Sequence, residues 1–466
     1  MTFIILIICV ILLALAVPVG IAVAIDSILP SLLSSSFTVS GVFVLRSMLG
    51  GINQTTLLAI PLFVLSGILM SRGGVSKRLF NFFAYFIGRK TAGIPCAVVV
   101  TCLFFGAISG SAPATVAAVG SMTIPFMLEL GYNKKFAVAL VAVAGGLGVI
   151  IPPSIPMILY AQASGTSVSD LFKAGIVPGF LIAAILMVYS WVYCKVNGED
   201  KEKINAVVDD LHKMNLWGLL KESGLALLTP VIILGCIYSG ITSPTEAAAI
   251  AVIYALLVSL LAYKSLKLKD LWGICVEAVK TYGPVLFILA SSVAFSRILT
   301  LMQVPQAVSS WITNDFSNKI IVLLMVNVIL LFVGMVLDTS PAIMLLTPIL
   351  LPAVQVFGID EVHFGIIMVV NLAIGFVTPP IGVNLFVASS LSQVPVMEIA
   401  RKAIIMIILF LIALLLITFI PGISTGLLTN PLLTVIVAAV VVVVLVAVLA
   451  AFNMLLTRKR RGGVQQ

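Results

Sequence analysis

The sequence predicts an all-α integral membrane protein, and three observations support that fold class. Of its 466 residues, 61% are hydrophobic and only 9% are charged, whereas soluble domains carry about 25% charged residues. The mean hydropathy is +1.26, which is too high for a chain that keeps its surface in water. Apolar runs of about 18 or more residues recur along most of the chain, and they lack the alternation of a β-barrel.

The apolar runs predict the helices in order. Single runs lie at about 2–28, 54–71, 135–163, 172–196, 223–241, 244–263, 276–302, 362–392, 403–427 and 431–456. Two pairs of shorter runs lie at 93–108 with 113–130, and at 320–337 with 341–357. The net charge of +9 resides mainly in the gaps between runs, which is the positive-inside pattern and does not indicate nucleic-acid binding. If the basic gaps are cytoplasmic, both pairs are re-entrant hairpins that open to opposite sides.

The same pattern divides the chain into segments. Residues 1–92 form first-repeat scaffold and arm helices, and 93–171 form the first hairpin and broken helix. Residues 172–319 are scaffold helices with a polar cytoplasmic connector at 197–222, either a solvated loop or a surface helix. Residues 320–398 repeat the hairpin and broken helix, 399–428 form the last core helix, and 429–466 form an extra transmembrane helix with a basic tail.

Two halves of the chain match at a nearly constant offset. Pro113 in "SAPAT" pairs with Pro341 in "TSPAI", 228 positions later, and Phe136 pairs with Phe364 at the same distance. The "GVIIPP" motif at 148–153 pairs with "GFVTPP" at 375–380, 227 positions later. Because the two hairpins are expected to open to opposite sides, we predict an inverted repeat, which is typical of secondary transporters.

Each half interrupts its helices with polar residues and proline. Proline removes an amide donor, and the freed carbonyls are tolerated at membrane depth only inside protein or beside a water-filled cavity. Carbonyl and hydroxyl oxygens suit a small hard cation, whereas helix N-termini favour an anion. The interruptions therefore predict a midplane site for an ion and an anionic substrate.

The polar residues of the interruptions are the candidate site. Asp338, just before the second tip, is a functional candidate because a carboxylate in the membrane costs about 3 kcal/mol or more. Its alternative role is to pair or to cap the second arm. Tip hydroxyls, such as those of Ser109 and Thr339, are either ligands or interhelical hydrogen-bonding groups. Ser154 and Asn384, after the Pro-Pro breaks, would either ligate or cap.

Other functional classes find little support. Asp338 has no obvious partner for an aspartyl protease, the two histidines are far apart, and no phosphate loop indicates direct use of ATP. We therefore expect no enzyme activity. The six cysteines are scattered and read as small buried hydrophobes. A stand-alone ion-coupled carrier and a channel remain alternatives, and the doubled broken helix favours a carrier.

Six motifs carry a resemblance to a known family. They are "LLAIPLFVLSGILM" (57–70), "GAISGSAPATVAAVGSMTIPFM" (106–127), "GVIIPPSIPMILYA" (148–161), "SPTEAAA" (243–249), "LDTSPAIMLLTPILLP" (337–352) and "TPPIGVNLFVAS" (378–389). In this order they resemble the DctM-like large membrane subunit of tripartite ATP-independent periplasmic (TRAP) transporters, over about residues 1–428. After Leu428 the chain departs from the family with a Val-, Ala- and Leu-rich span that ends in "RKRR".

The resemblance implies a function. Members are sodium-driven carriers of the bacterial inner membrane that move organic acids, such as sialic acid or C4-dicarboxylates, into the cytoplasm. They receive the acid from a periplasmic binding protein, work with a small four-helix membrane subunit (Q type), and use an elevator-type fold. We expect Na⁺ as the coupling ion.

The resemblance also implies site residues. One sodium site would use Ser109, Ser111 and Thr115 with Gly145, Gly148 and Pro152, and its mirror would use Asp338 and Thr339 with Gly375 and Thr378. The substrate would lie between the tips, near Ser111, Ala112, Pro113, Pro153, Ser154, Ser340, Pro341, Pro380 and Asn384.

Overall fold

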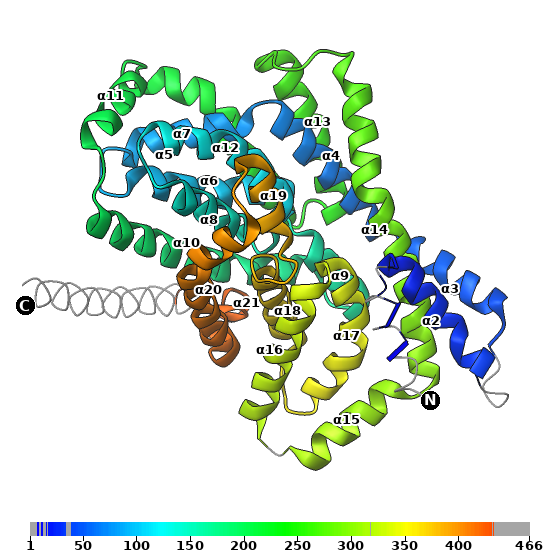
Figure 1. Ribbon diagram of the computed structural model, residues 1–466. Coiled ribbons are helices and arrows are strands. Elements are labelled where there is room, and N and C mark those ends of the chain that lie inside the picture. The colour runs from blue at the N-terminus through cyan, green and yellow to red at the C-terminus, as the bar shows by residue number, and fades with distance from the viewer. Residues whose placement is uncertain are drawn as a thin grey trace, which may run out of the picture.

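The regular elements of the described chain are all helices (Figure 1). The computed structural model describes residues 17–33, 39–316 and 318–430, together with positions 7, 8, 11, 12, 15 and 432. Within these ranges the predicted all-α class is confirmed. Seven helical segments are long and apolar enough to cross a membrane, at Thr55–Arg72, Val168–Asn197, Leu216–Tyr238, Pro244–Ala262, Asp270–Leu301, Lys319–Val336 and Val396–Phe419.

The helices of the first half end with the long α10. They are α2 (Val19–Leu33), α3 (Gly41–Ile52), the 3₁₀ turn η1 (Thr55–Leu58), α4 (Ala59–Arg72), α5 (Val75–Ile87), α6 (Gly93–Ser109), α7 (Ala112–Glu129), α8 (Lys134–Ala144), the 3₁₀ turn η2 (Gly145–Val149), α9 (Ile155–Ser164) and α10 (Val168–Asn197).

The remaining helices include the connector and the second half. They are α11 (Lys201–His212), α12 (Leu216–Tyr238), α13 (Pro244–Leu257) continued by a π turn (Val258–Ala262), α14 (Asp270–Leu301), α15 (Val304–Asp315), α16 (Lys319–Val336), α17 (Thr339–Gln355), α18 (Glu361–Gly375), α19 (Val383–Ser392), α20 (Val396–Phe419), a 3₁₀ turn (Pro421–Ile423) and α21 (Gly426–Thr429).

Most predicted runs coincide with helices, and the exceptions have physical reasons. The paired runs fall on α6 with α7 and on α16 with α17. The predicted run 2–28 is wrong at its end, because α2 continues to Leu33. Helices α3, α5 and α15 were missed because they have 12 or 13 residues and mixed polarity, below the length that marks a span. The predicted span 431–456 lies outside the described residues except at position 432.

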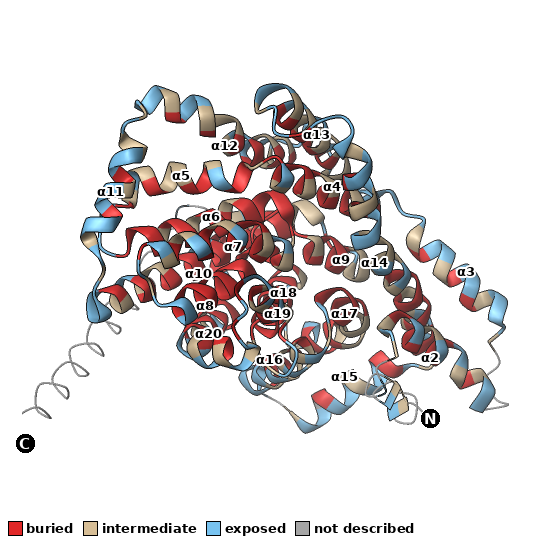
Figure 2. Ribbon diagram, turned by 45° about the horizontal axis from the view of Figure 1, so that its top comes forward, coloured by how far each residue is buried: buried red, intermediate tan, exposed pale blue. Residues whose placement is uncertain are grey.

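The connector at 197–222 holds a surface helix, one of the two predicted alternatives. The Asp200 side chain caps α11 by accepting a hydrogen bond from the Lys203 amide at 3.2 Å. Helix α11 lies on α5, where the His212 ring stacks on Tyr85 with ring centroids 4.2 Å apart. Figure 2 shows α3, α11 and α15 at the periphery, whereas the most buried residues gather around α6, α8, α10 and α18.

The order of helices in the first half recurs in the second. Helices α5 to α10 correspond one by one to α15 to α20, and each helix begins 226 to 229 positions after its counterpart. Left-handed backbone conformations also recur, at Gly74 and Gln303, at Gly131 and Gly358, and at Gly165 and Gln393. Cis peptide bonds lie at Pro152–Pro153 and Pro379–Pro380. The duplication seen in the sequence therefore extends to backbone geometry.

Corresponding helices exchange packing partners between the halves. Helix α9 packs on α17 while α19 packs on α7, and α8 packs on α20 while α18 packs on α10. On the outer side, α4 packs on α13 while α14 packs on α2. This exchange interleaves the two halves and places both broken helices at the centre of the molecule (Figure 1).

Candidate functional site

The first hairpin turns at a compact group of hydroxyls. Helix α6 ends at Ser109, Gly110 takes a left-handed conformation with φ of 62°, and α7 begins at Ala112. The Ser109 and Thr115 hydroxyl oxygens lie 2.9 Å apart, and Thr115 Oγ1 donates to the Ser111 carbonyl at 2.8 Å. Ser109 and Thr115 are buried. The predicted ligands Ser109, Ser111 and Thr115 therefore form one cluster.

The first broken helix packs directly against this tip. Helix α8 passes into η2 at Gly145, and α9 starts only at Ile155. The Ile155 amide donates to the Gly110 carbonyl at 3.3 Å. A Cβ on Gly148 would lie 2.7 Å from the Ser111 carbonyl oxygen, so glycine is required for this approach. The structure thus brings Gly148 next to Ser111 and Thr115, as predicted.

Ser154 is a helix cap. Its hydroxyl donates to the Val149 carbonyl at 2.5 Å and accepts from the Met157 amide at 3.3 Å, and the residue is fully buried. These two bonds satisfy a carbonyl freed by the break and an amide of the first turn of α9. Of the two predicted roles, ligand or cap, the geometry is that of a cap.

The second tip differs in its chemistry. The backbone is extended at Leu337, Asp338 is the N-cap residue of α17, and its carboxylate makes no capping hydrogen bond. Asp338 is exposed, whereas Thr339 and Ser340 are buried. After the second break, the Ile381 amide donates to the Met335 carbonyl at 3.3 Å, which parallels the Ile155–Gly110 bond of the first half.

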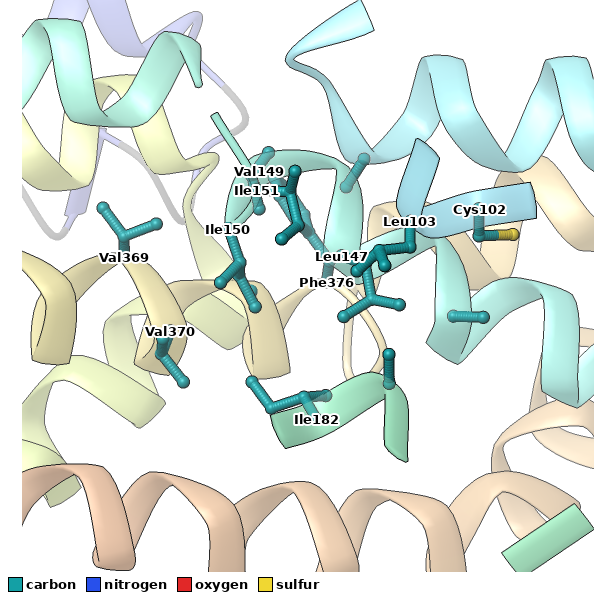
Figure 3. Close-up of a cluster of buried hydrophobic side chains, with 14 of the residues drawn as sticks. Cys102, Leu103, Leu147, Val149, Ile150, Ile151, Ile182, Val369, Val370 and Phe376 are labelled. Carbon is teal, nitrogen blue, oxygen red and sulfur yellow. The ribbon is translucent and has the colours of Figure 1, made fainter. Parts of the chain in front are cut away.

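Each hairpin touches its broken helix through a pair of glycines. A Cβ on Gly106 would lie 2.7 Å from Gly148 Cα, and a Cβ on Gly375 would lie 2.7 Å from Gly334 Cα. Gly334 follows Gly106 by 228 positions, and Gly375 follows Gly148 by 227. The two halves therefore share one backbone contact that no other residue permits. Figure 3 shows the apolar side chains between the breaks, with Leu147 to Ile151 from the first half and Val369, Val370 and Phe376 from the second.

A cavity of about 420 Å³ lies between the two tips and helices α4 and α14. Its lining includes six of the predicted residues, Ser109, Ser111, Pro113, Asp338, Thr339 and Ser340. The first turns of α7 and α17 both contribute to this wall, so two helix N-termini face the space. The arrangement suits an anion next to hydroxyl and carboxylate oxygens.

The other predicted site residues do not line this cavity. They are Ala112, Thr115, Gly145, Gly148, Pro152, Pro153, Ser154, Pro341, Gly375, Thr378, Pro380 and Asn384. Thr378 Oγ1 donates to the Ile374 carbonyl at 2.8 Å, and Asn384 Nδ2 donates to the Ala142 carbonyl at 3.0 Å. Asn384 thereby ties the second broken helix to the first, and it does not line the cavity.

Sequence reasoning missed the wall that faces the tips. Ser71 and Arg72 of α4 and Glu277, Thr281 and Tyr282 of α14 line the cavity. Gly67 of α4 packs closely against the first tip, since a Cβ there would lie 3.1 Å from Ser109 Cα. Arg72 follows directly after the apolar run 54–71, and nothing in the sequence places this helix end beside a hairpin tip more than 30 residues away.

A second missed group ties α16 to α18. Asn371 Nδ2 donates to the Asn327 carbonyl at 3.0 Å and to Asn327 Oδ1 at 2.8 Å. Asn327 Nδ2 in turn donates to the Leu323 carbonyl and to Thr418 Oγ1. The corresponding positions of the first half are Val99 and Ala144, so this amide clamp belongs to the second half alone.

Glu199 closes the base of the first hairpin. Its carboxylate, 1% exposed, accepts from the Ala92 amide at 3.0 Å and from Tyr132 Oη at 2.6 Å, and Lys201 Nζ lies 3.0 Å away. Burial raises the pKa of Glu199, but the hydrogen bonds from Tyr132, Ala92 and Lys201 outweigh it, so the pKa lies below its usual value. This carboxylate therefore positions both ends of the hairpin against the loop after α10.

The donors at the two tips fit a hard monovalent cation. No group of three or more His, Cys, Asp or Glu residues lies together within the described ranges. The polar atoms near the breaks are hydroxyl and carbonyl oxygens and one carboxylate, and such oxygens at broken helices coordinate Na⁺ in transporters. This donor set fits the Na⁺ that the family resemblance implies.

Comparison with known proteins identifies the family of this chain. The profile of the family described as "Tripartite ATP-independent periplasmic transporter, DctM component" matches residues 6–423. The chain belongs to this family. It is a large permease subunit of the TRAP type, and a multi-pass membrane protein.

Relatives of this permease include proteins with several named substrates. The chain is 42% identical over 375 residues to the C4-dicarboxylate TRAP transporter large permease protein DctM of Pseudomonas aeruginosa, covering 80% of the chain and 86% of that protein. It is 35% identical over 404 residues to the sialic acid TRAP transporter large permease protein SiaM of Vibrio cholerae, covering 87% and 93%. It is 41% identical over 411 residues to the isethionate TRAP transporter permease protein DctMQ of Oleidesulfovibrio alaskensis, covering 88% of the chain but only 64% of that protein.

Two solved transporters share the fold. The YdaH transporter of Alcanivorax borkumensis superposes with a TM-score of 0.58 at 13% identity, covering 85% of this chain and 91% of that chain. The MtrF structure of Neisseria gonorrhoeae superposes with a TM-score of 0.57 at 12% identity, covering 86% and 93%.

Proposed function

We propose that the permease is the translocation subunit of a sodium-coupled transporter that moves an organic acid into the cytoplasm. The observation that carries the proposal is the cavity between the two tips, where helix N-termini, hydroxyls and the Asp338 carboxylate converge. Helix N-termini stabilise the carboxylate of the acid, and the cation compensates the charge of Asp338.

The sodium ions bind beside the cavity, where each tip meets its broken helix. In the first half, Ser109, Ser111 and Thr115 supply oxygens beside Gly145, Gly148 and Pro152. In the second half, Asp338 and Thr339 act with the backbone at Gly375 and Thr378. The acid occupies the space between Ser111, Pro113 and Ser340 on the tips and the facing wall of α4 and α14.

Transport proceeds by an elevator mechanism on an inverted repeat. The helix pairs α6–α7 and α16–α17 are re-entrant hairpins that move with the broken helices, while α4, α13, α14 and α2 form the scaffold. The exchange of packing partners between the halves supports this division. In the scaffold, the contact of α4 with α13 has its counterpart in the contact of α14 with α2. Among the moving helices, the contact of α9 with α17 has its counterpart in the contact of α19 with α7.

The partners and substrate class follow from the family. We infer a small Q-type membrane subunit and a periplasmic binding protein as partners, in the bacterial inner membrane. The relatives are named for C4-dicarboxylates, sialic acid and isethionate, all small organic acids, and the first two classes are the proposed cargo.

Sodium-driven uptake into proteoliposomes, with both partner proteins present, tests the proposal. Asp338→Asn is expected to reduce uptake and to change its sodium dependence, because the carboxylate no longer compensates the cation. Asp210→Asn, an exposed carboxylate of α11, is the control and should behave as wild type. Uptake by Asp338→Asn with wild-type sodium dependence would refute the role of this residue, and uptake without any binding protein would indicate a stand-alone carrier.

A further inference from the structure

The wall that faces the hairpin tips carries one ion pair. Arg72 Nη2, at the end of α4, lies 2.6 Å from Glu277 Oε2 of α14, and both residues line the cavity. Their side chains are 60% and 42% exposed, so the pair lies at a solvent-exposed part of the cavity lining. Among the residues that line the cavity, three are charged: Arg72 is the one cation, and Glu277 and Asp338 are the two carboxylates.

The pair lies close to the first tip, on the helix that contacts it. Gly67 of α4 contacts Ser109 at the first tip. Arg72 is five residues further along the same helix, about 7.5 Å at the α-helical rise. An anion that leaves the tips toward the opening therefore passes within reach of the Arg72 guanidinium.

We propose that Arg72 is an exchange site for the carboxylate or sulfonate of the cargo, with Glu277 as its resident partner. As the anion leaves the helix N-termini, it takes the place of the Glu277 carboxylate on the Arg72 guanidinium. Glu277 then displaces the anion, and the cargo is released. Guanidinium suits this exchange because its planar fork binds either carboxylate in the same bidentate way.

Glu277 is needed because an unpaired Arg72 guanidinium would bind the cargo anion tightly and slow its release. With Glu277 present, the Arg72 guanidinium exchanges one anionic partner for another and is never left unpaired. The proposal rests on the function proposed above, since it takes an organic anion as cargo, and it adds the group that receives this anion on the scaffold side.

Two single variants and their combination separate this exchange from a purely structural ion pair. Binding of isethionate, succinate and sialic acid to the purified full chain in nanodiscs is measured for Arg72→Gln, Glu277→Gln and the double variant, and net uptake is measured with the partner proteins present. The surface pair Arg89–Asp209, at 2.5 Å and with similar exposure, supplies the controls Arg89→Gln and Asp209→Asn.

The expected pattern is asymmetric. Arg72→Gln weakens binding of the anion that wild type binds by at least tenfold, and Arg72→Lys, which keeps the charge but loses the fork, falls between. Glu277→Gln binds that anion at least threefold more tightly and yet takes it up at least threefold more slowly. The double variant behaves like Arg72→Gln, and both control variants behave like wild type.

Three results would overturn the exchange site. They are unchanged binding in Arg72→Gln, equal weakening in Glu277→Gln and Arg72→Gln, or effects matched by the control pair. These results leave the proposed function intact when wild type binds and transports an acid. A wild-type protein that binds none of the three anions would overturn both proposals.

Discussion

The glycine contact between α16 and α18 yields a prediction whose size follows from the structure. A Cβ added at Gly375 would lie 2.7 Å from Gly334 Cα and closer still to the Gly334 carbonyl, whereas ordinary contacts are 3.4–4 Å. The two helices must therefore separate by about 0.7 Å or more, and overpacking of this kind costs roughly 1–3 kcal/mol. We expect Gly375→Ala to destabilise the protein by that amount.

The displacement also reaches the second tip. Helix α16 ends at Val336, two residues before Asp338, so separating α16 from α18 moves the tip oxygens away from the backbone of the second break. A loss of about 1.4 kcal/mol in ion binding corresponds to a tenfold weaker apparent sodium affinity. Thermal unfolding in detergent and the sodium dependence of uptake measure the two effects separately.

Gly224→Ala is the matched control. Gly224 lies within α12, and an added Cβ would meet no atom within 4 Å. Alanine there should be neutral or stabilise the helix by up to about 1 kcal/mol. If Gly375→Ala unfolds at the temperature of Gly224→Ala and keeps the wild-type sodium dependence, then the close helix contact does not govern the second site.

Three further predictions concern single side chains. Ser154→Ala should cost about 1 kcal/mol in thermal stability through the lost cap of α9, with cargo affinity unchanged, since the hydroxyl lies outside the cavity. Asn371→Leu should destabilise by roughly 1–3 kcal/mol, because it leaves polar atoms of Asn327 buried without their partner, and differential scanning fluorimetry would measure it. Glu199→Gln should lower stability at neutral pH; since the folded pKa is lowered, the difference from wild type should shrink as the pH falls below the ordinary carboxyl pKa of about 4 and vanish only below the lowered folded pKa.

The hairpins and breaks could be predicted because their signals are local. Small polar residues and proline inside apolar runs mark the tips at 109–115 and 338–341, and the constant offset relates one tip to the other. The hydroxyl cluster around Ser109 forms within six residues of chain, so its spacing in the sequence is nearly its geometry.

The facing wall could not be predicted because its contacts are tertiary. Arg72 and Glu277 are 205 positions apart, and each ends or begins an apolar run, where charged residues are ordinary interface anchors. Asn327 and Asn371, 44 positions apart, lie within apolar runs and become a pair only when α16 packs on α18. Short amphipathic helices such as α15 could not be predicted for a different reason, since their length is that of any surface helix and does not mark a membrane span.

What the two halves share is backbone, and what distinguishes them is side-chain chemistry. The paired glycine contacts, the left-handed positions and the amide-to-carbonyl bond from each break to its hairpin all recur. The charged and amide groups do not, because Asp338 and the Asn327–Asn371 clamp have no counterparts in the first half. The close helix contacts at Gly106–Gly148 and Gly334–Gly375 admit only glycine. Sequence differences between the halves that keep both hairpins packed on their broken helices must therefore occur in the side chains around these contacts. The two proposed sites are therefore alike in backbone and unlike in charge, and we expect any difference in ion affinity between them to trace to those side chains.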